Sequence, residues 1–328
     1  MVALFKDRSP ANVIWLIILS IVVHSHFVFS PPQVQARDPD GLISVFLLRY
    51  LSDASDLFLI LVYHTIVVVQ ALRLNYLFND QRMFTRNNFI TAMVYIMLTG
   101  LLPEWSNITP VLIINTLLIW LFVKLVRLYN HPNPKTLLFN TGLIIGLSVL
   151  LYHPSVLLVL VVIFALLVVR PFNLPELLVM VMGVLSPFYF FAVYLFLNDE
   201  FPLFYRNLPR WSLNLPAVEN PRMLLVTAVL LLLMLGVGLF HWQGRTRRML
   251  IHVRKNWGVL LVMLVVTLPL PFISIYEDLD GLMLWLIPAS PFIAEGFLGP
   301  KKNTFPNAIF WTLLVLIGVN NWGFLIRR

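Results

Sequence analysis

Residues 222–240 read RMLLVTAVLLLLMLGVGLF, with one charged side chain at the first position. A helix rises about 1.5 Å per residue, so about 20 apolar residues cross the roughly 30 Å hydrocarbon core of a bilayer. The segment 245–255, which follows almost directly, is rich in arginine. An apolar run of this length with a basic cluster behind it is typical of a membrane-spanning helix that ends in the cytoplasm.

The composition of the 328-residue chain excludes an ordinary soluble protein. Hydrophobic residues make up 59% of it and charged residues 12%, against about 25% charged residues in soluble domains. The mean hydropathy is +0.87, so too few polar side chains are present to cover a soluble core. The absence of cysteine excludes disulfides and thiol catalysis. We attribute the net charge of +8 to Lys and Arg in cytoplasmic loops, and not to nucleic-acid binding.

We predict an all-α fold, a transmembrane helical bundle in which one integral membrane domain, residues 1–328, crosses the bacterial inner membrane about eleven times. The predicted spans are 11–30, 55–78, 89–103, 110–128, 137–152, 154–170, 175–197, 222–240, 257–276, 282–298 and 307–326. With the N-terminus in the cytoplasm, Lys or Arg stands at every inner loop, as the positive-inside rule requires. Most Asp and Glu residues then fall on the outer side, where a carboxylate site is expected.

Prolines interrupt the ninth and tenth predicted spans, at Pro269 and Pro271 and at Pro288 and Pro291. Non-helical backbone at membrane depth is tolerated only where it is buried in protein or lines a cavity. We therefore expect these two spans to line a cavity.

Asp38 and Asp40 are the candidate catalytic residues, in the first outer loop. One carboxylate of such a pair can act as a general base, or both can bind a divalent cation. The alternative is structural, because Asp-Pro-Asp-Gly is a strong β-turn sequence. The apolar segment 42–51 that follows is too short to span a bilayer and is expected to be an interfacial helix.

A second acidic cluster, formed by Glu277, Asp278 and Asp280, is predicted to lie in the outer loop between the ninth and tenth spans. Together with Asp38 and Asp40 it could hold a divalent cation such as Mg²⁺ or Mn²⁺, because hard cations prefer oxygen ligands. The alternative is an ordinary solvated loop.

His64 and Glu295 fall inside predicted spans, where an ionisable side chain is a functional candidate by default. Glu295 is expected to relay protons or to pair with Lys301 or Lys302, or else to reach the interface. His64 has the alternative of a neutral imidazole bonded to a neighbouring hydroxyl or backbone group. His24 and His26 would point about 200° apart on a regular helix, so we do not expect them to chelate a metal together.

Three residues of the outer side are candidates for substrate binding. Arg206 and Arg210, four positions apart, can hold a phosphate together if their segment is helical; the alternative is contact with lipid headgroups. His153 lies in the short Tyr152-His153-Pro154 hairpin between the fifth and sixth spans, and its alternative is again a neutral imidazole bonded to a neighbouring group.

Several motifs resemble a family of bacterial polytopic inner-membrane proteins that is defined by sequence alone, so the resemblance implies no activity. They are the stretches 75–80 (NYLFND), 87–89 (NNF), 125–130 (LVRLYN), 139–142 (FNTG) and 151–154 (LYHP).

The layout as a whole resembles the GT-C class of membrane glycosyltransferases, which take a sugar from a polyprenyl-phosphate carrier at the outer face. That resemblance implies that Asp38 or Asp40 is the base or metal ligand and that Arg206 or Arg210 holds the donor phosphate. The first outer loop is short for this class, and no long soluble domain follows the spans.

Three functions are therefore considered. The first is an outer-face transferase that acts on a lipid-linked sugar. The second is a lipid or solute transporter that uses Glu295 and the broken spans. The third is a non-catalytic subunit or scaffold of a cell-envelope complex, with other membrane subunits as partners.

Overall fold

The computed structural model describes residues 1–35, 41, 43–44, 50–51, 53–129, 131–171, 173–206, 208, 212–216, 220–273, 278–300 and 302–327, leaving aside the side chains of 206 and 324–327. Over these residues it contains thirteen α-helices and five 3-10 helices, and no β-strand. The bridge between Val34 and Ile108 is isolated. The prediction of an all-α fold is confirmed.

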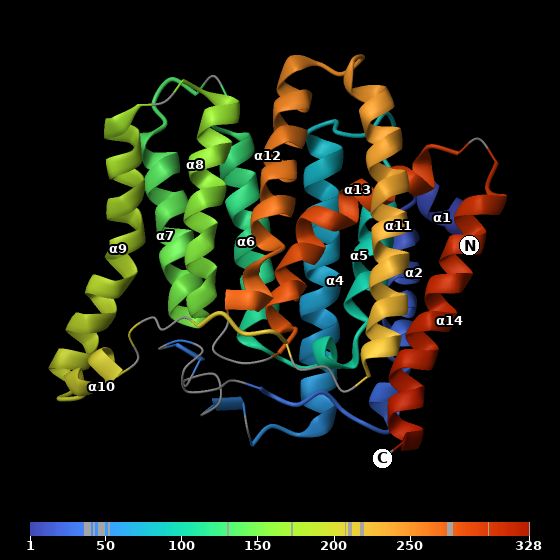
Figure 1. Ribbon diagram of the computed structural model, residues 1–328, viewed down its shortest axis with the longest axis horizontal. Helices are drawn as coiled ribbons and strands as arrows, with labels where there is room; N and C mark the ends of the chain where they lie inside the picture. The colour runs from blue at the N-terminus through green and yellow to red at the C-terminus, as the bar shows by residue number, and fades with distance from the viewer. Residues whose placement is uncertain are drawn as a thin grey trace.

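A helix lies in each predicted span. These helices are α2 (Asn12–Val23), α4 (Asp56–Asp80), α5 (Ile90–Thr99), α6 (Pro110–Val126), α7 (Lys135–Leu151), α8 (Leu158–Val169), α9 (Leu174–Leu197), α11 (Pro221–Thr246), α12 (Ile251–Thr267), α13 (Leu286–Leu298) and α14 (Thr304–Arg327). The short helices are α1 (Val2–Lys6), α10 (Phe201–Arg206), η1 (Ser25–Val28), η2 (Pro103–Ser106), η3 (His153–Leu157), η4 (Leu270–Ile273) and η5 (Asp280–Trp285). They form one bundle, and the α4–α5, α6–α7, α8–α9 and α11–α12 loops lie at its upper end in Figure 1.

Five helical segments of the described chain are long and apolar enough to cross a membrane: Asp56–Asp80, Leu174–Leu197, Pro221–Thr246, Ile251–Ile273 and Asp280–Leu298. Some of these apolar helices are largely exposed at the surface of the bundle, which is unlike the helices of a soluble bundle. Only 17% of the apolar window of α9 is buried, against 89% for the segment that contains α13. Soluble proteins rarely expose apolar faces as large as that of α9, so the fold indicates a helical membrane protein with α13 at its centre.

The helices differ from the predicted spans at two places around α12. The basic loop predicted at 241–256 shrinks to 247–250, because α11 continues to Thr246 and α12 already begins at Ile251. Arg and Lys are good helix formers, so both helices extend beyond their apolar stretches. At its other end α12 stops at Thr267, before Pro269 and Pro271, because proline cannot continue the hydrogen-bond ladder.

Polar side chains in the centre of the bundle join four elements. Tyr95 of α5 donates a hydrogen bond to Gln70 Oε1 of α4 at 2.7 Å, and Gln70 Nε2 donates to the Leu112 carbonyl of α6 at 2.7 Å. Asn115 Nδ2 donates to Tyr95 Oη and to the Met283 carbonyl of η5, both at 3.3 Å. These bonds fix the register of the helices, because each joins a side chain of one element to a defined atom of another.

Candidate functional site

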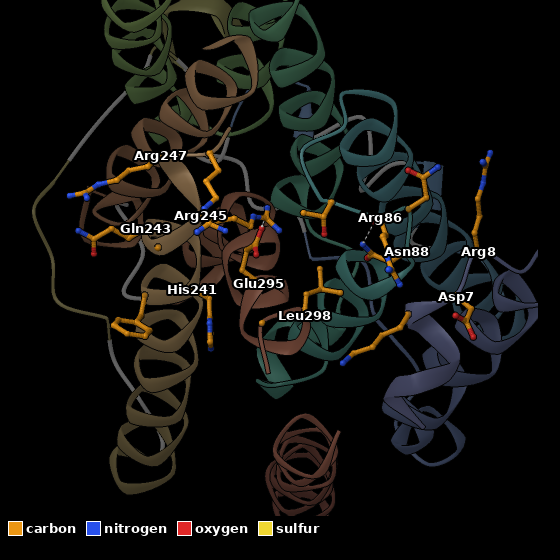
Figure 2. A pocket seen from close by; sticks show the side chains of 17 residues that line it. Asp7, Arg8, Arg86, Asn88, His241, Gln243, Arg245, Arg247, Glu295 and Leu298 are labelled. Carbon is orange, nitrogen blue, oxygen red and sulfur yellow. Dashed lines mark hydrogen bonds and ion pairs between the residues drawn. The ribbon is translucent and has the colours of Figure 1, made fainter. Parts of the chain in front are cut away.

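A cavity of about 1110 Å³ opens at the upper end of the bundle, between α1, the α4–α5 loop, α11 and α13. Its lining carries six Lys and Arg side chains against the two carboxylates of Asp7 and Glu295. The six, named here the cavity cations, are Lys6, Arg8, Arg86, Arg245, Arg247 and Arg248. Figure 2 shows Arg245 and Arg247 on one side of the cavity and Arg8 and Arg86 on the other. Charge of one sign inside a concave, low-dielectric wall concentrates ions of the opposite sign, so the cavity is suited to an anion.

An ion pair lies at the inner wall of the cavity. Arg245 Nη2 of α11 donates to Glu295 Oε1 of α13, as the dashed line in Figure 2 marks. The Glu295 side chain is 2% exposed and that of Arg245 is 24% exposed, so the carboxylate lies beneath the guanidinium. Arg245 Nη2 also donates to the Met83 carbonyl at 3.0 Å. The arginine therefore joins α11, α13 and the end of the α4 segment.

A close crossing of α11 and α13 places this pair. A Cβ atom on Gly238 would lie 1.9 Å from the Phe292 carbonyl oxygen, so only glycine allows this approach. Arg245 lies about two turns beyond Gly238 on the same face of α11, and Glu295 lies about one turn beyond Phe292. The two charged side chains therefore meet as a consequence of the glycine contact.

The α4–α5 loop is held at the rim of the cavity by asparagines. Asn75 Nδ2 and Asn79 Nδ2 donate to the Asn88 carbonyl at 2.8 and 2.9 Å. Asn88 Nδ2 donates to the Arg86 carbonyl at 2.9 Å, and Asn88 Oδ1 accepts from the Ile90 amide at 3.0 Å. The asparagines that the sequence motifs singled out thus fix the position of Arg86.

The N-terminal helix α1 forms another wall. Its Phe5 carbonyl accepts from the Phe89 amide at 2.7 Å, and Lys6 Nζ donates to Asn303 Oδ1 at 2.7 Å. Partial burial lowers the pKa of the Lys6 ammonium group, because desolvation disfavours the charged form. Asn12 Nδ2 donates to the Leu4 and Asp7 carbonyls at 2.8 and 2.7 Å, so the segment that carries Lys6 and Arg8 is anchored at both ends.

Glu295 was predicted to pair with Lys301 or Lys302, and that prediction is corrected. Its partner is Arg245, fifty positions earlier in the chain; Lys302 is exposed and Lys301 lies outside the described residues. Nearness in sequence misled the prediction, because helix crossing brings Arg245 closer.

The prediction that both proline-containing spans line a cavity holds for the end of the tenth span, where Glu295 and Leu298 line this cavity. Pro288 and Pro291 themselves are buried in packed protein and do not line it. α12, in the ninth span, contributes no lining residue to this cavity.

His64 follows the structural alternative, since its Nδ1 atom forms a hydrogen bond with Ser20 Oγ at 2.8 Å. The premise for His24 and His26 was wrong, because α2 ends at Val23 and His24 already caps it. The rings of His24 and His64 lie 5.7 Å apart, and His24 Nε2 forms a hydrogen bond with Tyr63 Oη at 3.2 Å. Over the described part of the chain, no group of three or more His, Cys, Asp or Glu side chains is placed to hold a metal ion.

The predicted outer site is described only in part. Asp38, Asp40, Arg210 and Glu277, and the side chain of Arg206, lie outside the described residues, as does most of the predicted interfacial helix at 42–51. Among the remaining candidates, Asp278 precedes η5 and Asp280 begins it. His153 is buried at the start of η3, away from the residues that line the basic cavity.

A separate apolar groove of about 330 Å³ runs between α7 and α9. Its lining residues are Ile43, Leu143, Leu147, Leu150, Ser186, Pro187, Phe190, Phe191 and Tyr194. The segment before α4 reaches this groove, because the Ile43 amide donates to the Leu150 carbonyl at 2.9 Å. A Cβ atom on Gly41 would lie 2.2 Å from the same carbonyl oxygen, so the backbone after Asp40 packs directly on the end of α7.

Comparison of the chain with protein-family models, with curated proteins and with solved structures finds no match. The functional assignment therefore rests on the geometry of the cavity. From the sequence, Arg245, Arg247 and Arg248 are expected to set the topology and to lie against anionic lipid headgroups, and no local motif marks them as parts of a site.

Proposed function

We propose that the chain crosses the bacterial inner membrane about eleven times, with the basic cavity facing the cytoplasm. Two features support this proposal. Helices occupy every predicted span, and the cavity cations lie at the end of the bundle that the positive-inside rule assigns to the cytoplasm.

We further propose that the cavity binds a phosphate-bearing ligand, and that the protein transports this ligand across the membrane. The observation that carries the proposal is the convergence of six Lys and Arg side chains from three elements on one cavity. A guanidinium group can donate two parallel hydrogen bonds to two phosphate oxygens, so arginine is well suited to bind phosphate. The transporter hypothesis is favoured over the scaffold because Glu295 lines this cavity, whereas a scaffold needs no buried ionisable group there.

The volume of about 1110 Å³ exceeds what one phosphate fills, and it matches sites for ligands of drug size or larger. Asn87 and Gln243 add neutral hydrogen-bonding groups to the lining. The ligand is therefore a phosphate joined to a larger polar group. A lipid headgroup and a soluble phosphate ester share this chemistry.

Neutralising a cavity cation should weaken pyrophosphate binding. We expect Arg86→Gln and Arg248→Gln each to raise the dissociation constant about fivefold, because each loses about 1 kcal/mol of charge-assisted hydrogen bonding at a partly hydrated site. Equilibrium binding to the purified protein in nanodiscs measures this, and added salt should weaken wild-type binding. Phosphatidic acid and glycerol phosphate are then tested as competitors of pyrophosphate. Stronger competition by phosphatidic acid indicates a lipid ligand, and stronger competition by glycerol phosphate indicates a soluble phosphate ester.

Arg254→Gln is the matched control, because Arg254 is an exposed basic residue of α12 that does not line the cavity. It should bind pyrophosphate as the wild type does. An equal loss of affinity in the control would show that overall charge, and not the cavity, attracts the anion.

A second candidate is the outer-face transferase on a lipid-linked sugar. The apolar groove between α7 and α9 favours it, because the groove begins at Ile43, beside the loop that carries Asp38 and Asp40 in the sequence, and has the apolar lining that a polyprenyl chain requires. If this function holds, cells with Asp40→Asn at normal protein level should accumulate the same lipid-linked sugar as cells that lack the protein. Accumulation in the deletion alone would leave Asp40 as a turn residue.

A further inference from the structure

Glu295 is a buried carboxylate in a cavity whose lining carries mostly Lys and Arg side chains. Its Oε1 atom accepts from Arg245 Nη2, one of the cavity cations that a ligand phosphate would meet. Arg245 also donates a hydrogen bond to the Met83 carbonyl at 3.0 Å. This second bond keeps the guanidinium in position if Glu295 is replaced as its acceptor. The carboxylate itself is 2% exposed.

Carboxylate and phosphate oxygens are equivalent acceptors for an arginine fork. A phosphate that reaches Arg245 therefore competes with Glu295 for the same donors. If both anions stayed charged, they would repel each other across one guanidinium in a medium of low dielectric constant. The repulsion disappears when the carboxylate takes up a proton, as happens for closely spaced acids that share a site.

We propose that the ligand phosphate replaces Glu295 as the partner of Arg245, and that one proton binds to the Glu295 carboxylate in the same step. The proton comes from cytoplasmic water, which reaches the cavity, and it ends on an oxygen of Glu295. No other bond forms or breaks, and the ligand loses no proton. The protein thus takes up an anion together with a proton. This inference rests on the proposed binding of a phosphate-bearing ligand.

The other charged and titratable groups that line the cavity come from three parts of the chain. α1 and its following residues bring Lys6, Asp7 and Arg8, the α4–α5 loop brings Arg86, and α11 with the residues after it brings His241, Arg247 and Arg248. His241 is the only one of these whose residue type ordinarily titrates near neutral pH. A test must therefore separate His241 from Glu295.

The test is sulfate binding by the wild type and by Glu295→Gln at pH 6, 7 and 8. Sulfate is the probe because its charge does not change in this range. Linkage requires that a group protonated only in the complex tighten binding as the pH falls, by at most tenfold per unit for one proton. We expect the wild type to bind sulfate about three- to tenfold more tightly at pH 6 than at pH 8.

Glu295→Gln keeps His241 and removes the competing charge. It should bind sulfate at pH 8 at least as tightly as the wild type does at pH 6, with a smaller dependence on pH. Weaker binding at every pH would overturn the inference and make Glu295 a group that positions Arg245. An equal pH dependence in both proteins would overturn it as well.

Proton uptake by the wild type is the second measurement, and it does not depend on the folding of the variant. Adding sulfate to the lightly buffered protein at pH 7 should raise the pH of the solution. Sulfate binding with no change in pH contradicts the inference but leaves the proposed function standing. Absence of any anion binding, in the wild type and in the variant at all three pH values, removes the proposed function itself.

Discussion

Arg245→Met should destabilise the folded protein by about 3–5 kcal/mol and abolish anion binding. The reason is that Glu295, whose side chain is 2% exposed, would lose its partner and would either stay buried as an unpaired charge or take up a proton. Removing one partner of a buried ion pair is strongly destabilising. The Met83 carbonyl would lose a donor as well. Thermal unfolding of the purified protein and pyrophosphate binding measure the two effects.

The double variant Arg245→Met with Glu295→Leu separates stability from binding. Replacing a buried ion pair by apolar side chains is often neutral or stabilising, so the double variant should regain most of the lost unfolding temperature. It should still fail to bind pyrophosphate, because the anchoring guanidinium is gone. Wild-type affinity in this double variant would show that the ligand site lies elsewhere.

Gly238→Ala should cost about 2–3 kcal/mol and weaken anion binding at the same time. The added methyl group would lie 1.9 Å from the Phe292 carbonyl oxygen, so α11 and α13 must separate, and overpacking of this kind is destabilising. Because the same crossing brings Arg245 to Glu295, their separation should disturb the cavity. The unfolding temperature and the dissociation constant of pyrophosphate are the measurements.

Gly236→Ala, two positions earlier in the same helix, is the matched control. A Cβ atom on Gly236 meets nothing within 4 Å, and alanine is the better helix former by about 1 kcal/mol. This variant should be as stable as the wild type or more stable. If both glycine variants lost the same stability, helix flexibility and not the crossing would be the cause.

The helical segments were predictable from sequence because each carries a long apolar run, and such runs have few alternatives in a membrane. The helix ends were less predictable. The apolar run of α11 ends near Phe240, but the helix continues to Thr246. Arginine and glutamine are good helix formers, so the helix extends past its apolar residues. Hydropathy marks the membrane boundary and not the end of the hydrogen-bond ladder.

The cavity was not predictable, although Glu295 and the arginine-rich segment 245–255 stand out in the sequence. Arg245 and Glu295 are fifty positions apart. Their contact depends on the close crossing of α11 and α13 at Gly238, which no local sequence pattern predicts. The positive-inside rule gave the arginines a sufficient explanation, so their second role was not sought. Glu295 alone was recognised as a functional candidate, because a carboxylate inside an apolar span is rare.

The most direct test of the cavity uses the absence of cysteine from the chain. Gln243, which is exposed and lines the cavity, can be replaced in a Gln243→Cys variant and treated with a membrane-impermeant maleimide, with Arg254→Cys as the control. We expect both cysteines to react in inside-out vesicles and not in intact cells, and pyrophosphate to slow the reaction of the Gln243→Cys variant alone. Reaction from the outer side would contradict the proposed orientation, and a rate unaffected by pyrophosphate and by the other phosphate ligands would contradict an anion site in this cavity.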